Sequence, residues 1–415
     1  MMNKILLEKI KRRLDDSLPE MVRLQCDLTA IPALAPENGG DGESDKAAFL
    51  KKFLLSAGFS DVIDYPAPDS RVTSGNRPNL ITVIPGNNRE RTVWILTHLD
   101  VVPPGNLDLW DHNPYEGYVK DGKIFGRGTE DNQQDLVASL FAAKAFLDEG
   151  VRPENTVGLA FVSDEETGSN KGLKYLLETQ RSLFRHTDLI VVPDSGSSDG
   201  SKVEVAEKSM LWVRFRTVGK QCHASRPELG RNAFLAASHL VVKLSHLTDS
   251  FNFSDPLYEP PVSTFQPTRK DANVPNINTI PGDDVFYLDC RVLPRYPLSE
   301  VLDAMRKAAD DVERTFDVRI EISPVEQVQA PPPTPTDAPV VKALERAIKD
   351  IYGVSAEPVG IGGGTVAAPF RQVGFPVAVW SRIDLTAHQP NEFCFIENML
   401  GDAKVYAHLF LQGLD

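Results

Sequence analysis

The sequence predicts an α/β protein with a mostly parallel sheet, into which a smaller ferredoxin-like α+β domain is inserted. Three observations support this. Between residues 80 and 195, apolar runs typical of buried strands alternate with helical patterns. Near Val203 the pattern changes to strands with one polar face. After the proline-rich stretch 330–335 the helix and strand alternation resumes. We therefore expect the first domain at 1–202 and 329–415, and the insert at 203–328.

Each element of the first domain has its own signal. The strands are short apolar runs bounded by turn residues, at 80–86, 92–100, 156–166, 188–196 and 375–381. Two helices are expected at 131–149, which Gly150 ends, and at 338–351. The first sixteen residues predict an amphipathic helix. Their apolar stretch is too short and too interrupted by charges for a signal peptide.

The insert shows the order strand, helix, strand, strand, helix, strand, which is ferredoxin-like. Its first strand, MLWVRFRTV at 210–218, places Leu211, Val213 and Phe215 on one face and arginines on the other. The expected elements are 210–218, 232–247, 276–280, 284–293, 299–315 and 318–323.

Composition excludes several classes of function. The 415 residues include 44 Lys and Arg against 58 Asp and Glu, a formal charge of −14. An acidic chain without a basic run is unsuited to nucleic acid or to an anionic membrane. No apolar run approaches the ~18 residues of a membrane span. The four cysteines are scattered, which argues against a disulfide framework and against a cysteine zinc site. We expect a cytoplasmic protein.

Histidines and carboxylates follow the predicted strands of the first domain. They are His98, Asp100, Glu165, Glu166, Asp194 and His388, with Asp131 at the expected start of a helix. Singly, each has an ordinary structural explanation, such as a helix cap for Asp131. Together they matter, because loops beyond the carboxyl ends of strands in an open α/β sheet converge on one crevice. Imidazole and carboxylate are the ligands of hydrolytic zinc sites.

The same residues carry a family resemblance. THLDVVPPG (97–105), GRGTED (126–131), SDEETGS (163–169), VVPDSG (191–196) and AHQPNEF (387–393) occur in this order. The set resembles the dinuclear zinc metallohydrolases, the family of acetylornithine deacetylase, succinyl-diaminopimelate desuccinylase, aminoacylase and glutamate carboxypeptidase. CHASRPELGRNA (222–233) resembles a segment of that family's inserted lid domain. The resemblance implies a zinc-hydrolase catalytic domain and a lid that forms a homodimer.

The resemblance also implies roles for individual residues. One Zn²⁺ would be held by His98, Asp131 and Asp194, and a second by Asp131, Glu166 and His388, with Asp131 bridging. Asp100 would accept a hydrogen bond from His98 and so select its tautomer. Glu165 would be the general base. His223 would reach the active site of a neighbouring subunit and help to stabilise the oxyanion.

The chemistry is consistent with these roles. A metal lowers the pKa of bound water from ~15.7 to ~7. A nearby carboxylate can then accept its proton and pass it to the leaving amine. Oxygen-rich ligand sets accept several divalent metals, so Co²⁺ and Mn²⁺ remain alternatives to Zn²⁺.

A substrate of this class carries a free carboxylate beside the scissile amide. Arg291 is the main candidate to bind it, because a guanidinium holds a carboxylate through two parallel hydrogen bonds. Asn273 and Asn278 are further candidates. Gly363 and Thr365, in GIGGGT at 360–365, would line the site. Many family members have Asp after this turn, where this chain has Val366.

The activity expected is the hydrolysis of an N-acyl amino acid, by a deacylase or desuccinylase. A dipeptidase or carboxypeptidase with the same metal centre is the alternative. Two remote alternative hypotheses assign a different class of function to the chain. GSSDG (196–200) matches the serine-hydrolase pattern around Ser198, although no helix is expected after it. The second alternative is a non-catalytic dimeric binding protein, although relatives of that kind usually lack one of the metal ligands or the general base.

Overall fold

The computed structural model describes residues 4–413, which form two compact units. The first unit comprises Met1–Val205, Thr334–Pro358 and Thr365–Asp415. The second comprises Ala206–Pro333 and Val359–Gly364. Within residues 4–413 no helix is both long and apolar enough to cross a bilayer.

The first unit is built on an eight-stranded sheet of order β1-β4-β8-β5-β9-β18-β10-β17. The four central strands, β8, β5, β9 and β18, are parallel, whereas β4 and β10 pair antiparallel with their neighbours. The strands are β1 (Val62–Asp64), β4 (Leu80–Ile84), β5 (Asn88–His98), β8 (Asn155–Val162), β9 (Leu189–Gly196), β10 (Lys202–Glu207), β17 (Glu357–Ile361) and β18 (Val377–Ser381). The expected α/β class is confirmed.

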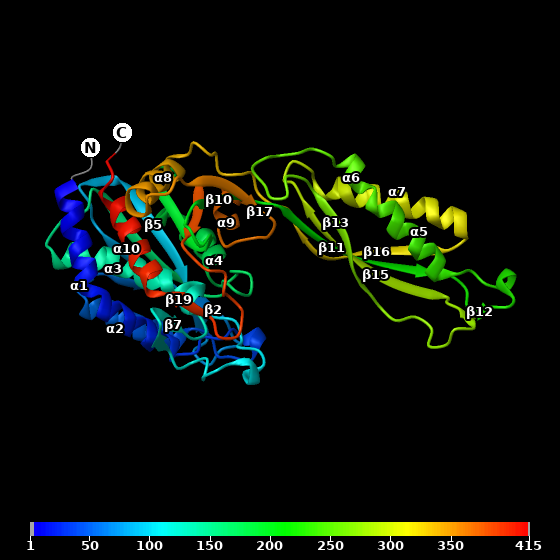
Figure 1. The fold of residues 1–415 in the computed structure, drawn as a ribbon, viewed down its shortest axis with the longest axis horizontal. Helices are drawn as coiled ribbons and strands as arrows, with labels where there is room; N and C mark the ends of the chain where they lie inside the picture. Colours follow the sequence, from blue (N-terminus) through cyan, green and yellow to red (C-terminus); the bar gives the residue numbers. More distant parts are fainter. Residues whose placement is uncertain (1–3, 414–415) are drawn as a thin grey trace. The chain divides into compact units, whose positions relative to one another are not determined.

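Helices cover both faces of this sheet (Figure 1). Side chains alternate along a strand, so Trp94 and Leu96 of β5 face α4 and α9, while Val93 and Ile95 are buried on the other side, toward α3. Helix α3 in turn packs against α1 and α10. The helices are α1 (Lys4–Thr29), α2 (Ser44–Ser56), α3 (Gln134–Asp148), α4 (Leu173–Thr179), α8 (Pro339–Tyr352), α9 (Ala368–Gln372) and α10 (Ile396–Leu411).

Short elements complete the first unit. Strands β6 and β7 form a hairpin that β19 joins, and β2 pairs with β3. These strands are β2 (Ala67–Pro68), β3 (Asn76–Arg77), β6 (Tyr118–Lys120), β7 (Lys123–Phe125) and β19 (Phe393–Phe395). Single helical turns lie at Pro36–Asn38, Leu107–Leu109 and Arg181–Leu183, and Thr129–Gln133 forms an irregular turn with non-helical angles at Asp131 and Asn132.

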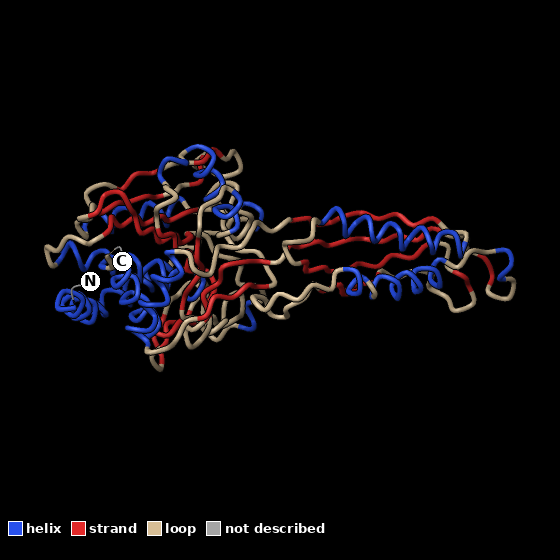
Figure 2. The backbone as a smooth tube through the Cα atoms, turned by 90° about the horizontal axis from the view of Figure 1, so that it is seen from above, coloured by secondary structure: helices blue, strands red, loops and turns tan. Residues whose placement is uncertain are grey.

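The second unit is an antiparallel sheet of order β13-β15-β11-β16 with helices along it (Figure 2). Its apolar core joins Leu211, Val213 and Phe215 to helices α5 and α7. The elements are β11 (Ser209–Val218), β12 (Cys222–His223), a turn at Pro227–Leu229, α5 (Ala233–Ser245), α6 (Leu247–Ser250), β13 (Thr264–Lys270), β14 (Thr279–Ile280), β15 (Asp283–Val292), α7 (Leu298–Phe316) and β16 (Arg319–Val328). This connection order is ferredoxin-like.

Two expected elements are wrong in detail. The second strand of the insert is β13, at Thr264–Lys270, and not 276–280, of which only β14 is a strand and pairs with β12. Strand β13 contains Pro267 and lies at the sheet edge with mostly exposed residues, so it lacks an apolar signal. Helix α3 begins at Gln134, because Asp131 has the non-helical angles φ −113° and ψ 91°.

Candidate metal centre

Seven polar residues of the first unit come together beyond one edge of the sheet. His98 ends β5 and Asp194 lies near the end of β9, while Glu165 and Glu166 follow β8. Parallel strands bring their carboxyl ends to the same edge. Asp131 comes from the segment before α3, and His388 and Asp100 come from loops after β18 and β5.

The first group of candidate ligands is His98, Asp131 and Asp194. Their ligand atoms all lie within 4.8 Å of one another. Nε2 of His98 is 2.9 Å from Oδ1 of Asp131 and 3.5 Å from Oδ1 of Asp194. The imidazole ring is buried, with 1% of the side chain exposed.

The second group is Asp131, Glu166 and His388, again within 4.8 Å. Nε2 of His388 is 3.1 Å from Oδ2 of Asp131 and 3.2 Å from Oε2 of Glu166. The two oxygens of Asp131 therefore point toward different histidines. That arrangement is the one expected of a carboxylate shared by two cations.

Asp100 holds the loop that carries both glutamates. Its Oδ1 accepts a hydrogen bond from the N–H of Glu165 at 3.1 Å, and its Oδ2 one from the N–H of Glu166 at 3.0 Å. The backbone oxygen of Asp100 lies 3.0 Å from Nδ1 of His98, whereas its carboxylate lies 3.6 Å from that atom. The backbone oxygen of Asp100 is thus the nearer partner of His98, while the carboxylate, the expected partner, lies within ion-pair distance of the same nitrogen and also binds the glutamate loop.

A buried ion pair holds the residue directly before the two glutamates. The guanidinium of Arg77 and the carboxylate of Glu43 are fully buried and bonded to each other. Glu43 also accepts the N–H of Asp164 at 3.2 Å, directly before Glu165. Glu165 and Glu166 therefore project from a backbone that is fixed on two sides.

Comparison with known proteins now identifies the family. Residues 94–412 match the model of peptidase family M20/M25/M40, a span that contains every member of both ligand groups. The chain belongs to this family. It is therefore a metal-dependent hydrolase that acts on amide or peptide bonds, as the resemblance implied, and the non-catalytic alternative falls away.

Several relatives of this M20 hydrolase match over nearly its whole length. A protein of Methanocaldococcus jannaschii named as an uncharacterised metallohydrolase is 40% identical and covers 94% of this chain and 98% of its own. A succinyl-diaminopimelate desuccinylase of Cereibacter sphaeroides is 27% identical, with 89% and 93% covered. Human carnosine dipeptidase 1 has the same fold, with a TM-score of 0.73 at 19% identity, covering 98% of both chains.

Carboxylates shift the pKa values of both histidines at the M20 site. Burial disfavours the charged form of His98, yet its hydrogen bonds with Asp131 and Asp194 outweigh burial and raise its pKa well above the usual value. Hydrogen bonds with Asp131 and Glu166 raise the pKa of His388 to about 10. Both shifts have the same cause, which is the group of carboxylates that surrounds the two imidazoles.

The residues fit divalent cations. Burial raises the pKa of Glu165 well above its usual range, and the nearby Asp194 adds to this effect. Burial also raises the pKa of Glu166. Carboxylates crowded in this way need positive charge beside them, and two imidazoles with carboxylate oxygens form a donor set suited to zinc and to related metals.

The remaining predicted site residues lie elsewhere in the chain. In the second unit, Nδ2 of Asn273 donates to Asp284 at 2.8 Å, and the backbone oxygen of Asn278 accepts the N–H of Ala224, next to His223. His223 is exposed at the β12 and β14 pair. Thr365, in the first unit, caps the N–H of Ala367 at 3.2 Å.

Arg291 is already engaged within the second unit. Its Nε and Nη2 donate to the two carboxylate oxygens of Asp289 at 2.8 and 3.1 Å. Its Nη1 donates to the backbone oxygen of Gly362 at 3.0 Å, beside Gly363. A guanidinium has five N–H donors, so two remain for another acceptor.

Two other features lack catalytic geometry. Ser198 is exposed in a turn that strand β10 follows, whereas a nucleophile elbow requires a helix there.

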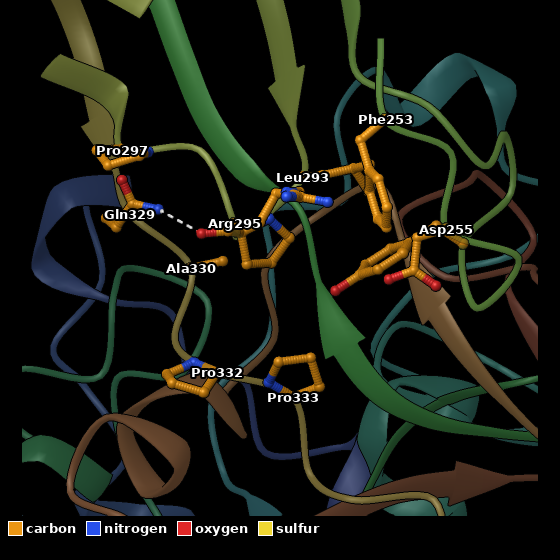
Figure 3. A pocket seen from close by; sticks show the side chains of 11 residues that line it. Phe253, Asp255, Leu293, Arg295, Pro297, Gln329, Ala330, Pro332 and Pro333 are labelled. Atoms are coloured by element: carbon orange, nitrogen blue, oxygen red, sulfur yellow. Dashed lines mark hydrogen bonds between the residues drawn. The ribbon is translucent and has the colours of Figure 1, made fainter. Parts of the chain in front are cut away.

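The second unit contains a cavity of about 570 Å³ beside Phe253, Arg295 and the prolines 332 and 333 (Figure 3). Its surface is mainly apolar and includes none of the predicted site residues.

The sequence reasoning missed two buried carboxylates, Glu130 and Glu392, beside the candidate ligands. Both are almost inaccessible, with 3% and 0% of the residue exposed. The signal for both was present, since Glu130 lies in GRGTED and Glu392 in AHQPNEF, each next to or near a predicted ligand.

Proposed function

We propose that this M20 enzyme hydrolyses the amide bond of an N-acyl amino acid whose carboxylate is free. The observation that carries the proposal is the shared position of Asp131 between two histidines, with Glu165 beside it. The desuccinylase relative, which matches along 89% of this chain, favours an acyl substrate.

We assign one divalent metal to His98, Asp131 and Asp194, and a second to Asp131, Glu166 and His388. Zn²⁺ is the expected metal, and Co²⁺ and Mn²⁺ are the alternatives. Bound metals of this kind acidify water and polarise the carbonyl of the scissile bond.

Glu165 is the proposed general base. It stands in a group with His98 and Glu166, yet the two ligand sets are complete without it. Burial raises its pKa, and a carboxylate with a raised pKa is a stronger base toward the proton that it must accept. The hydrogen bond from its own backbone N–H to Asp100 fixes the backbone from which the side chain projects.

The substrate carboxylate is assigned to Arg291, through the two guanidinium N–H groups that Asp289 and Gly362 leave unused. Asn273, Asn278, Gly363 and Thr365 are proposed to contribute further contacts. We propose a homodimer formed through the second unit, in which His223 supplies a hydrogen bond to the oxyanion at the partner's site.

A dipeptidase or carboxypeptidase activity is the second candidate. It would use the same metal centre, because a peptide with a free terminal carboxylate presents the same amide beside a carboxylate. The two candidate activities differ in the chemical group on the acyl side of the scissile amide bond.

The test is amine release by the metal-loaded protein on a matched panel. The panel contains N-acetyl, N-succinyl and N-formyl amino acids and dipeptides, each with a free or an esterified carboxylate. Release from free-carboxylate N-acyl compounds supports the proposal, and release from dipeptides alone supports the second candidate. Equal release from the esterified partners would contradict the role given to the carboxylate.

A further inference from the structure

Two glutamates connect the segments that carry Asp131 and His388. Glu130 directly precedes Asp131, and Glu392 follows His388 by four residues. Each side chain is buried and bonds to the backbone of the other segment. Neither belongs to the candidate ligand groups.

Glu130 binds the loop that leads to His388. Its Oε1 accepts the N–H of Asp384 at 2.6 Å. Its Oε2 accepts the N–H of Thr386 and that of Ala387, the latter at 2.9 Å, and lies 3.0 Å from the Thr386 hydroxyl. One carboxylate thus accepts three backbone N–H groups from four consecutive residues, beside a hydroxyl that also bonds to the backbone oxygen of Phe393.

Glu392 makes the opposite connection. Its Oε1 accepts the N–H groups of Glu130 and Asp131 at 3.0 and 3.1 Å, and its Oε2 accepts that of Gly128 at 3.0 Å. Arg127 neutralises it through a buried ion pair of 2.6 Å. The segment before α3 is therefore held in its non-helical path by a residue from the far end of the chain.

The His388 loop needs such support. Three of its non-glycine residues, Leu385, His388 and Asn391, have φ of 60°, 63° and 58°, a conformation that side chains disfavour. The imidazole of His388 is 55% exposed, compared with 1% for His98. Packing therefore immobilises His98, whereas the position of His388 depends on its backbone.

We propose that Glu130 and Glu392 form a reciprocal clamp that sets the distance between Asp131 and His388, and with it the affinity of the metal position these two share with Glu166. The inference rests on the metal assignment under the proposed function. Glu130 is a positioning residue in this view, since it acts through His388. The two metal positions should therefore differ in how far their affinity depends on the clamp, because His98 is held independently by β5 and by Asp100.

The test is a titration of metal-free protein with Co²⁺, read by the visible absorption of the bound ion and by metal analysis, for the wild type and Glu130→Gln. The glutamine side chain accepts hydrogen bonds only through its amide oxygen. Its NH₂ group would therefore face backbone N–H donors with which it cannot form hydrogen bonds. We expect the tighter binding step to remain and the weaker step to lose affinity by ~10–100-fold, the range for residues that orient ligands.

Control variants separate this role from a general structural one. Glu397→Gln changes an exposed glutamate five residues beyond Glu392 and should leave both steps unchanged. Glu130→Asp retains the charge at shorter reach and should weaken the same step to a smaller extent. Thr386→Val removes the hydroxyl beside Glu130, together with its hydrogen bonds with the backbone of Phe393, and serves where the Glu130 variants fail to fold.

The proposal is overturned if Glu130→Gln binds both equivalents as the wild type does, or if both steps weaken equally. A wild-type chain that binds only one metal also overturns it. Failure of the proposed function has a different signature, which is wild-type protein that binds two metals and releases no amine.

Discussion

Asp131 directs one carboxylate oxygen to each of two histidines: Oδ1 lies 2.9 Å from Nε2 of His98, and Oδ2 lies 3.1 Å from Nε2 of His388. The residues come from three separate segments of the first unit. Hydrogen bonds with both imidazoles lower the pKa of Asp131 although its burial opposes this. A carboxylate that stays ionised in this position is suited to two cations.

Asp131→Ala should abolish binding at both metal positions rather than at one. The substitution removes an oxygen from each proposed ligand set, so metal content measured after dialysis should fall from two per chain to fewer than one. Asp303→Ala, an exposed aspartate on α7, is the control and should retain the wild-type content. Retention of one tightly bound metal by Asp131→Ala would contradict the shared ligand.

Glu165→Gln should keep both metals and lose most turnover. Removal of a general base costs ~10²–10⁴-fold in rate. Steady-state kinetics together with metal analysis measure both quantities, and Glu178→Gln on the exposed face of α4 is the matched control. A Glu165→Gln enzyme with normal kcat would show that another group accepts the proton.

Arg291→Lys should lower kcat/KM selectively for substrates with a free carboxylate. Hydrogen bonds to charged groups contribute about 1.5–3 kcal/mol, which corresponds to roughly 10–100-fold. Lysine cannot reproduce the planar fork that Arg291 presents. The control variant is Arg269→Lys, which changes an arginine on the edge strand β13. If esterified substrates lose as much as the free acids, Arg291 supports the fold and does not recognise the carboxylate.

His223→Ala should reduce the rate without loss of metal, since this histidine belongs to neither ligand group. If it acts at the site of a partner subunit, mixing His223→Ala with Asp131→Ala under conditions of subunit exchange should restore part of the activity. The mixed dimer then contains one site with both components. No recovery, with exchange demonstrated by labelled subunits, would argue that His223 acts within its own chain or not at all.

Asp402 should make stability depend on pH. Burial raises its pKa to about 7 in the folded chain, against ~3.9 for an unfolded aspartate. Between these values the folded state binds more protons, so the free energy of unfolding should fall as pH rises through this window. Asp402→Asn should flatten that slope in urea denaturation between about pH 5 and about pH 8. An unchanged slope would assign the effect to other groups.

Local pattern was sufficient for much of the architecture. Buried strands such as β5 and β8 are apolar runs bounded by turns, and helix α7 follows a regular amphipathic period, so neighbouring residues alone define them. Strand β13 was missed because its stability comes from pairing with β15, while its own residues, with Pro267 and exposed polar side chains, resemble a loop.

The candidate metal ligands are predicted from the sequence alone, because the order of motifs and their positions after strands are properties of the chain. How those residues are held depends on the folded structure. The irregular path at Asp131, the contact of Arg291 with Gly362 and the roles of Glu130 and Glu392 all depend on hydrogen bonds between segments that are distant in the sequence. A buried carboxylate takes its role from the donors that surround it, and folding alone determines which donors those are.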